Sequence, residues 1–352
     1  MYDHVGGGFF RYCVDEKWIY PHFEKLALDN AWMIFTLVEF YKESKKPLYK
    51  RIVDETIVFM NSSLLGEDAY FYSGVNADSE GREGAHYLWR AEEIFHSLGT
   101  SQGIDFCEWF GLNPQGNFPN EEGTLDGFHH LGLETSLEDQ LNPSDMRLYQ
   151  SMREKLRLKR ETREQPIIEN KKILEFNAIS ALALIQYGTT FDHASFAEQG
   201  LELFDRITQD YLDRKSRVLT QPHFGSFVTQ LIDSASLIFA HSWASTLLEG
   251  HLAKKLRAKA HQLLQSCISQ FWDNERGGFF SCIDNLEYPR HKEFYDSSLP
   301  SPNSLLAWSI HLLNHDEFES YLDVILNAPL KIDPDNPSFF GIIHMLRKLR
   351  GV

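Results

Sequence analysis

The sequence has little of several features that identify common classes of protein. Its 352 residues include only four cysteines, Cys13, Cys107, Cys267 and Cys282, which lie far apart and form no Cys-x-x-Cys pair. This spacing excludes a disulfide scaffold and a zinc knuckle, and is typical of reduced thiols. No apolar run approaches the roughly 18 residues that a membrane-spanning helix needs, and the N-terminus has no basic or apolar leader segment. We therefore expect a cytoplasmic protein that is not bound to a membrane.

Basic residues are also in deficit. The chain carries 34 Lys and Arg against 50 Asp and Glu, so its formal net charge is −16. Such a charge gives no general attraction for phosphate backbones, and we expect no nucleic-acid partner. The sequence has no Gly-x-Gly-x-x-Gly, Walker loop, His-Glu-x-x-His or Gly-x-Ser-x-Gly string, so nucleotide, zinc-protease and serine-hydrolase sites lack their signatures. We expect no cofactor and no metal.

Helical periodicity dominates what is present. Apolar residues recur with a 3.6-residue period, which predicts paired helices and an all-α core. The predicted helices cover residues 23–43, 47–63, 142–163, 172–187, 192–211, 227–248, 251–271, 301–314, 318–327 and 337–349. No Ser-, Gly- or Pro-rich linker divides the chain, and residues 111–132 are expected to form one long loop. We predict a single domain over residues 1–352.

One type of loop recurs between the predicted helices. Asp3 and Asp273 each precede a Gly-Gly-Phe-Phe string, at residues 7–10 and 277–280, and residues 69–74 are a looser version. The glycines allow positive φ in a tight turn, and the aromatic residues then begin a short extended segment. Repetition of one loop indicates stacked, similar helical hairpins.

Two polar clusters could carry chemistry. The first contains His22, Glu24, Asp29 and Asn30, at the predicted start of a helix. His22 could transfer protons, because imidazole titrates near neutral pH. The alternative is a helix-capping and ion-pair cluster without a chemical role.

The second cluster runs from residue 76 to residue 84 and has three interpretations. Its alternating oxygen side chains resemble the start of a calcium loop, but Tyr87 stands where an EF-hand needs a bidentate Glu. Asp78 with Glu80 or Glu83 could instead be the paired carboxylates of a glycoside-processing site. The third alternative is a solvated acidic turn. Aromatic residues make up 13% of the chain, and those in the loops could stack on a sugar or simply belong to the core.

Several strings resemble the C-terminal domain of the thioredoxin-domain-containing YyaL and spermatogenesis-associated protein family. The matching residues are Tyr2 to Phe9, Arg11, Tyr12, Pro21 to Lys25, Asp29, Asn30, Ala77 to Gly81, Gly116 to Phe118, Asn177, Lys292, Glu293, Tyr295, Asp296, Pro300, Ser301, Asn303 and Ser304. Their order and spacing run through nearly the whole chain, so the match is specific.

The resemblance implies an (α/α)6 toroid of the six-hairpin glycosidase type, similar to N-acylglucosamine 2-epimerase, with short β-hairpins in the loops. A carbohydrate pocket would lie at one end of the toroid. The resemblance implies His4, His22, Asp78, Glu80 and Asp296 as catalytic residues of this pocket. It implies the following substrate-binding residues: Asp3, Arg11, Tyr12, Glu24, Asp29, Asn30, Glu83, Asn177 and Asn303.

Departures from the family pattern keep a second function open. The thioredoxin-like domain is expected to be absent, the toroid is expected to lack its first hairpin, and a homo-oligomer or another partner would then cover the exposed edge. Phe10, Asn76 and Ser234 stand where the family has ionisable residues, while Leu28 and Phe176 replace Tyr and Trp. The chain is thus either a carbohydrate-active enzyme, an epimerase, isomerase or glycoside hydrolase, or a non-catalytic interaction domain.

Overall fold

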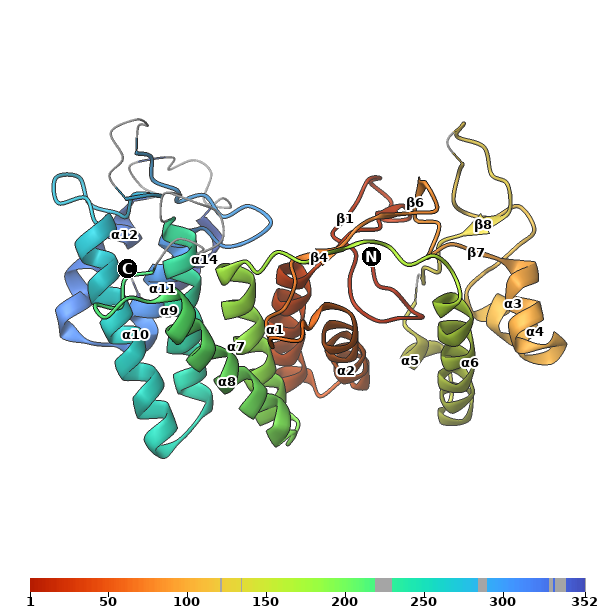
Figure 1. The fold of residues 1–352 in the computed structure, drawn as a ribbon, viewed down its shortest axis with the longest axis horizontal. Helices are drawn as coiled ribbons and strands as arrows, with labels where there is room; N and C mark the ends of the chain where they lie inside the picture. The colour runs from red at the N-terminus through yellow and green to blue at the C-terminus, as the bar shows by residue number, and fades with distance from the viewer. Residues whose placement is uncertain are drawn as a thin grey trace. The chain divides into compact units, whose positions relative to one another are not determined.

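The computed structural model describes residues 1–120, 122–133, 135–218, 230–283, 290–328, 332 and 340–351. The chain divides into two compact units, Met1–Lys172 and Ile173–Val352, which Figure 1 shows in red to yellow-green and in green to blue. Each unit is described by itself below. The prediction of a single domain stays a prediction.

Unit 1 combines helices with short two-residue strands. Its helices are α1 (Ala27–Ser44), α2 (Pro47–Phe59) with a π-helical turn (Met60–Leu64), α3 (Ala91–Leu98), α4 (Thr100–Trp109), α5 (Leu137–Gln140) and α6 (Pro143–Glu161). Its strands are β1 (Tyr12–Cys13), β2 (Pro21–His22), β3 (Lys25–Leu26), β4 (Gly74–Val75), β5 (Asp78–Ser79), β6 (Arg82–Glu83), β7 (Trp89–Arg90), β8 (Phe128–His129) and β9 (Ile168–Glu169). They pair as β1–β2, β3–β4–β9, β5–β6 and β7–β8.

Unit 2 is helical over its described residues. Its α-helices are α7 (Leu174–Thr190), α8 (Ala194–Tyr211), α9 (Leu231–Leu247), α10 (Gly250–Phe271), α11 (Pro302–Leu313), α12 (Glu319–Asn327) and α14 (Gly341–Arg350), with a 3-10 turn η2 (Asp316–Phe318). Helices α7 and α9 are apolar nearly all round and buried, and each packs against an amphipathic neighbour, α8 or α10. Inner and outer helices therefore alternate along the chain, as a stack of helical hairpins requires.

The predicted helices are confirmed to within a few residues where the structure describes them. The predicted start at residue 23 is wrong, because Lys25 and Leu26 pair with β4 and the helix begins at Ala27. The starts of the helices predicted over 227–248 and 337–349 lie outside the described residues. Helices α3 and α4 were not expected, since Gly99 and Gly103 interrupt their short periodic patterns.

The two Gly-Gly-Phe-Phe loops have the same hydrogen bonds. In unit 1, Asp3 N donates to Gly8 O and Gly7 N donates to Asp3 O; in unit 2, Asp273 and Gly277 take the same roles. Gly7 and Gly277 have φ of +77° and +71°, a conformation that favours glycine. The prediction of one repeated loop is confirmed.

An asparagine and a lysine fix each of these loops to its unit. Asn30 accepts from Phe9 N at 2.7 Å, and Asn303 accepts from Phe279 N at 2.9 Å. Lys25 donates to Asp3 and to the Gly7 carbonyl, as Lys292 donates to Asp273 and to the Gly277 carbonyl. Asn30 and Asn303 therefore each hold one of the two loops against the first turn of an inner helix.

The unit 1 loop carries a buried ionic triad that the unit 2 loop lacks among its described residues. Arg160 of α6 donates two hydrogen bonds of 2.9 Å to the Asp3 carboxylate, and Lys25 Nζ lies 2.7 Å from the same group. Burial opposes ionisation of Asp3, but Arg160 and Lys25 outweigh it and hold its pKa well below its ordinary value. Burial lowers the pKa of Lys25 to about 8, with Asp3 opposing the shift. The triad joins the N-terminal loop, β3 and α6.

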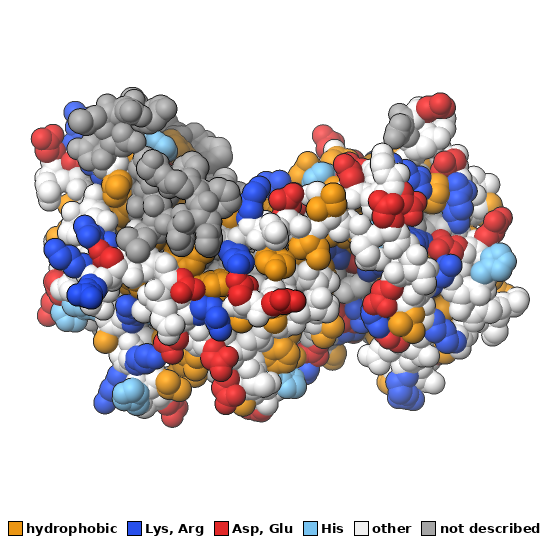
Figure 2. Space-filling view, viewed as in Figure 1, with side chains coloured by type: hydrophobic (Ala, Val, Ile, Leu, Met, Phe, Trp, Pro, Cys, Tyr) orange, Lys and Arg blue, Asp and Glu red, His pale blue; other side chains and the backbone are white. Residues whose placement is uncertain are grey.

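No helix within the described part of the chain is long and apolar enough to cross a membrane. On the face drawn in Figure 2, acidic and basic side chains are interspersed over the described surface.

Lys25→Met tests how much the triad stabilises unit 1, and Lys292→Met tests the corresponding ion pair between Lys292 and Asp273 in unit 2. The side chain of Lys25 is 1% exposed and that of Lys292 is 17% exposed. Removing one member of a buried ion pair costs about 3–5 kcal/mol, whereas a partly solvated pair contributes about 1 kcal/mol. We expect Lys25→Met to reduce the free energy of unfolding by about 3 kcal/mol and Lys292→Met by about 1 kcal/mol, measured by urea denaturation. Equal losses of unfolding free energy in the two variants would contradict a larger contribution of the triad to stability.

Candidate functional site

The N-terminal ribbon brings four predicted site residues together. Strands β1 and β2 are antiparallel with Tyr12 opposite His22, so both side chains lie on one face. The Tyr12 and His22 rings stack with centroids 4.8 Å apart. Arg11 N donates to the Glu24 carbonyl at 2.8 Å, which brings Glu24 beside Arg11 just beyond the paired residues of the ribbon.

A chain of charged contacts connects these residues. Arg11 Nη1 donates to Glu24 Oε2 at 2.9 Å, and His22 Nε2 lies 3.8 Å from the same oxygen. His22 Nδ1 makes a 2.6 Å hydrogen bond with Glu83 Oε1, which also accepts from the Phe23 amide at 3.3 Å. Arg11, Tyr12, His22, Glu24 and Glu83 are called the His22 cluster below. When His22 Nδ1 carries the proton, Glu83 orients the ring and Nε2 is left as the basic atom.

The acidic segment after residue 76 forms a β-hairpin. Asp78 pairs with Glu83 and Ser79 pairs with Arg82, and the turn residues Glu80 and Gly81 have φ of +53° and +76°. Two positive φ values in a two-residue turn are typical of type I′ hairpins. The segment therefore does not form the calcium loop considered from the sequence. Its register sets the carboxylates of Asp78 and Glu83 side by side, whereas Glu80 lies at the turn and its amide donates to Glu164.

A cavity of about 480 Å³ borders the His22 cluster, with Glu83 in its wall. The Phe118 and Phe128 rings provide apolar surface, and Arg82 and Asn120 provide polar groups. Gly116 has φ of +83° and a Cβ there would lie 2.4 Å from the Phe128 carbonyl, so the turn before Phe118 requires glycine. Asn117 then exchanges hydrogen bonds with the His130 backbone. The Gly116-Asn117-Phe118 string thus has a structural role, which is to place the Phe118 ring in the wall of the cavity.

Asp29 is the predicted residue with the most perturbed environment near the His22 cluster. Burial raises its pKa to about 6, with Arg11 lowering it and Glu24 raising it further. Within the described residues, its Oδ2 atom is buried and has no hydrogen-bond partner. A carboxyl group that holds its proton to pH 6 can act as an acid beside ionised neighbours.

His4 does not share a contact with His22. Its ring packs edge-on against Tyr2 and Phe110, with centroids 5.1 Å and 5.4 Å away, and its carbonyl accepts from the Tyr149 hydroxyl. Burial, with Arg51, lowers the pKa of His4 well below its ordinary value. The structure thus places His4 in an aromatic core, and Asp3 in the ionic triad, apart from the contacts of the His22 cluster.

The remaining predicted site residues lie in unit 2. Asp296 accepts from the amides of Ser301 at 2.9 Å and Ile342 at 3.1 Å, so its carboxylate caps the starts of α11 and α14. Asn177 is fully buried in α7, where its amide donates to the Ile173 carbonyl. These two residues and Asn303 all make contacts that support the backbone.

Sequence reasoning missed two carboxylates in unit 2. Glu175 and Asp233 lie in the first turns of α7 and α9, and Asp233 accepts from the Glu175 amide at 3.3 Å. Burial raises the pKa of Glu175 to about 7, with Asp233 and Glu293 adding to the shift, and burial raises that of Asp233 to about 6. The available signal was an acidic residue at the start of an otherwise apolar predicted helix, the same position as Asp29.

Unit 1 has a second cavity, with a volume of about 340 Å³. Its wall includes Lys25, His86, Tyr87 and Arg160. Burial lowers the pKa of His86 to about 4, and Arg160 adds to this effect, so the imidazole is neutral at pH 7. The cavity opens on Lys25 and Arg160, the cationic members of the triad; Lys25 belongs to a string that matches the family, whereas Arg160 belongs to none.

The described part of the chain holds one group of three His, Cys, Asp or Glu residues close enough to share a metal ion. It consists of His261, His315 and Glu317 in unit 2, which were not predicted.

The comparisons with known proteins agree with this fold. No family model matches the sequence. Spermatogenesis-associated protein 20 from Homo sapiens is 26% identical over 345 residues, which are 88% of this chain and 44% of that protein; the protein from Mus musculus is also 26% identical, over 346 residues and 43% of its length. The chain spans less than half the length of these curated relatives.

Solved structures with a similar fold are cellobiose 2-epimerases. The enzyme from Bacillus thermoamylovorans aligns with a TM-score of 0.54 and that from Spirochaeta thermophila with 0.53, each at 11% identity. The alignments cover 93% of this chain and 66% and 64% of those chains. The predicted family resemblance and all-α fold class are confirmed: the chain is a distant homologue of spermatogenesis-associated protein 20 with the (α/α)6 fold of sugar epimerases.

Proposed function

We propose that this protein binds a carbohydrate in the 480 Å³ cavity beside the His22 cluster and acts on it by acid–base chemistry. The observation that carries the proposal is the 2.6 Å hydrogen bond between His22 Nδ1 and Glu83, because Glu83 also lines the cavity. A histidine oriented by a carboxylate is a suitable general base near neutral pH. The Phe118 and Phe128 rings supply the flat apolar surface on which a sugar ring stacks.

The geometry favours isomerisation over the other sugar reactions considered. His22 Nε2 would take the proton from the carbon beside the carbonyl of a ring-opened sugar, and the released electron pair would form an enediolate. Arg11, held by Glu24, could balance the charge on the enediolate oxygen. Epimerisation needs a second base on the opposite face of the sugar, and His4 lies in the aromatic core instead. Returning the proton to the neighbouring carbon with a single base gives an aldose–ketose isomerase.

Hydrolysis is supported by a different pair of groups. Asp29 with a pKa of about 6 could donate a proton, while Glu24, which forms an ion pair with Arg11, could serve as the base. The non-catalytic alternative is favoured by the ion pairs that already engage His22, Glu24 and Glu83, because a binding domain needs only the cavity.

Solvent exchange separates these alternatives. In D₂O, proton abstraction replaces the hydrogen on the carbon beside the carbonyl, which proton NMR detects as a lost signal. We expect exchange and ketose formation with an aldose such as glucose, mannose or cellobiose, and a reduction of about 10²–10⁴-fold in His22→Gln. N-acetylglucosamine discriminates further, because its substituted C2 can epimerise but cannot become a ketone.

Glu83→Gln should also slow exchange, because the amide no longer fixes the tautomer of His22. His96→Ala, which removes an exposed histidine of α3 in the same unit, is the matched control and should keep full activity. Release of reducing sugar from aryl glycosides without exchange would instead support hydrolysis. Saturable sugar binding without either reaction would leave only the binding domain, and the absence of binding to the whole panel would contradict the proposal.

Asp29→Asn tests whether the ionised Asp29 carboxylate destabilises the folded state, as its raised pKa implies. A carboxyl pKa raised from 3.8 to about 6 means that the folded state binds the proton more tightly than the unfolded chain. Its contribution to stability is therefore complete below about pH 4 and is lost as the pH rises through 6. At pH 7.5 the amide should raise the free energy of unfolding by about 1–2 kcal/mol, and at pH 4 this gain should vanish.

Urea denaturation at the two pH values measures this difference. Glu92→Gln, which changes an exposed carboxylate of α3, is the control and should alter the free energy of unfolding by less than about 0.5 kcal/mol at either pH. A loss of stability in Asp29→Asn at pH 7.5 would show that the ionised carboxylate supports the fold.

A further inference from the structure

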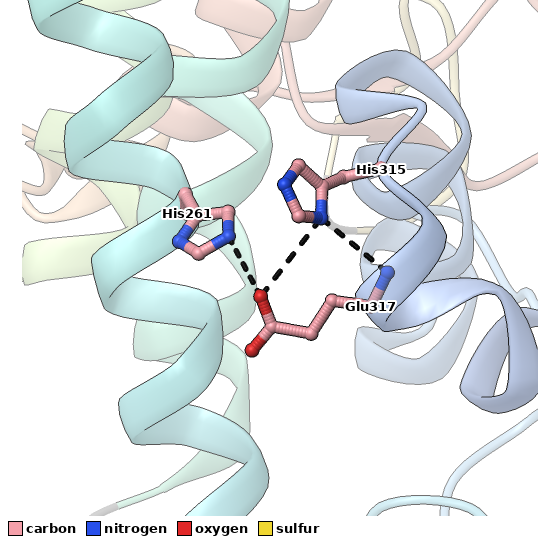
Figure 3. Close-up of side chains that lie close together, drawn as sticks. All are labelled: His261, His315 and Glu317. Carbon is pink, nitrogen blue, oxygen red and sulfur yellow. Dashed lines mark hydrogen bonds and ion pairs between the residues drawn. The ribbon is translucent and has the colours of Figure 1, made fainter.

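Three potential metal ligands converge on the surface of unit 2, remote in sequence from the His22 cluster. Figure 3 shows His261 on α10 facing His315 and Glu317, which lie in the turn that follows α11. His261 Nε2 is 3.0 Å from Glu317 Oε2, and His315 Nδ1 is 3.8 Å from the same oxygen. One ligand atom from each residue lies within 4.8 Å of the other two.

The backbone holds the two segments in this arrangement. Helix α11 ends at Leu313, and the left-handed conformation of Asn314 (φ 44°, ψ 59°) turns the chain so that His315 directly precedes the 3-10 turn η2. Phe318 at the end of that turn is 1% exposed, and its ring packs against His261 with centroids 4.8 Å apart. The buried ring thus fixes the distance between His261 and the turn that carries His315 and Glu317.

The surrounding hydrogen bonds leave the ligand atoms suitably oriented. Gln265, one turn along α10 from His261, donates to Glu317 Oε1 at 2.7 Å, so Glu317 Oε2 is directed to the histidines. His315 Nδ1 accepts from the Glu317 amide at 3.4 Å, so this nitrogen carries a lone pair, which a metal ion would take in place of that long hydrogen bond. The hydrogen bond from Gln265 to the outer oxygen of Glu317 is of the kind by which proteins usually orient a metal-binding carboxylate.

We propose that His261, His315 and Glu317 bind a Zn²⁺ ion that ties α10 to the turn after α11. Two imidazoles and one carboxylate, with a water in the fourth position, form a common zinc ligand set. Bonds of about 2.0–2.1 Å place tetrahedral ligand atoms about 3.4 Å apart, close to the 3.0 and 3.8 Å between these side chains. The site needs only small rotations of partly exposed side chains, and zinc replaces the attraction between His261 and Glu317.

Calorimetric titration of the metal-free full chain with ZnCl₂ tests the site. We expect one ion per chain, and at least a tenfold weaker affinity in each of His261→Ala, Glu317→Gln and His315→Asn. The asparagine at 315 retains an oxygen that can accept from the Glu317 amide, so that variant removes the imidazole without removing the helix cap. The unfolding temperature of each variant without metal, compared with wild type, reports whether it folds.

His251→Ala is the matched control, because His251 is an exposed histidine in the first turn of the same helix, and its loss should leave zinc binding unchanged. Co²⁺ provides a second readout, since tetrahedral coordination gives intense visible absorption bands that His261→Ala should abolish. Zinc binding that survives in all three ligand variants would overturn the proposal, as would binding lost equally in His251→Ala. The site lies in the other unit from the sugar cavity, so its failure would not affect the proposed function.

Discussion

The hydrogen bonds of Arg160 and Lys25 to the Asp3 carboxylate are the constraint on which unit 1 depends. Three segments far apart in the sequence, the N-terminal loop, β3 and α6, meet at this one carboxylate. Lys25 is the last anchored side chain before α1, and the ribbon carrying His22 comes directly before it. The triad therefore fixes the chain just after His22. The Asp3 carboxylate is buried, and burying its charge without a partner would cost too much free energy for the fold to tolerate.

The sequence was sufficient for the helical framework because burial of one face imposes a 3.6-residue period on amphipathic helices such as α8 and α10. It was also sufficient for the repeated loop, because positive φ at Gly7 and Gly277 restricts the residue type. Helices α3 and α4 escaped notice because each is short and glycine lies at their boundary and inside α4. The hairpin of residues 78–83 was ambiguous because alternate oxygen side chains suit a calcium loop and a strand equally.

The structure brings some of the predicted site residues together and separates others, and the separations have a common cause. Strands β1 and β2 pair, so Arg11 and Tyr12 lie beside His22 and Glu24 although the two segments are separate in the sequence. A motif residue does not reveal whether its side chain faces a cavity or the core. His4, Asn30 and Asn303 all belong to motifs, but the His4 ring packs in the aromatic core and the two asparagines support the backbone. Arg160 stands outside any string, and only its tertiary contacts distinguish it. Glu175 and Asp233 are marked in the sequence only by their position at the start of an apolar helix.

The two Gly-Gly-Phe-Phe loops reach equivalent anchors over different lengths of chain. The anchoring lysine comes 22 residues after the aspartate in one loop and 19 residues after it in the other, and the asparagine comes 21 and 24 residues after its phenylalanine. The loop is therefore defined by its partners and not by their spacing. Insertions and deletions between the turn and its anchors can accumulate without unfolding it, which frees the intervening segment to diverge while the helices beneath it stay in place.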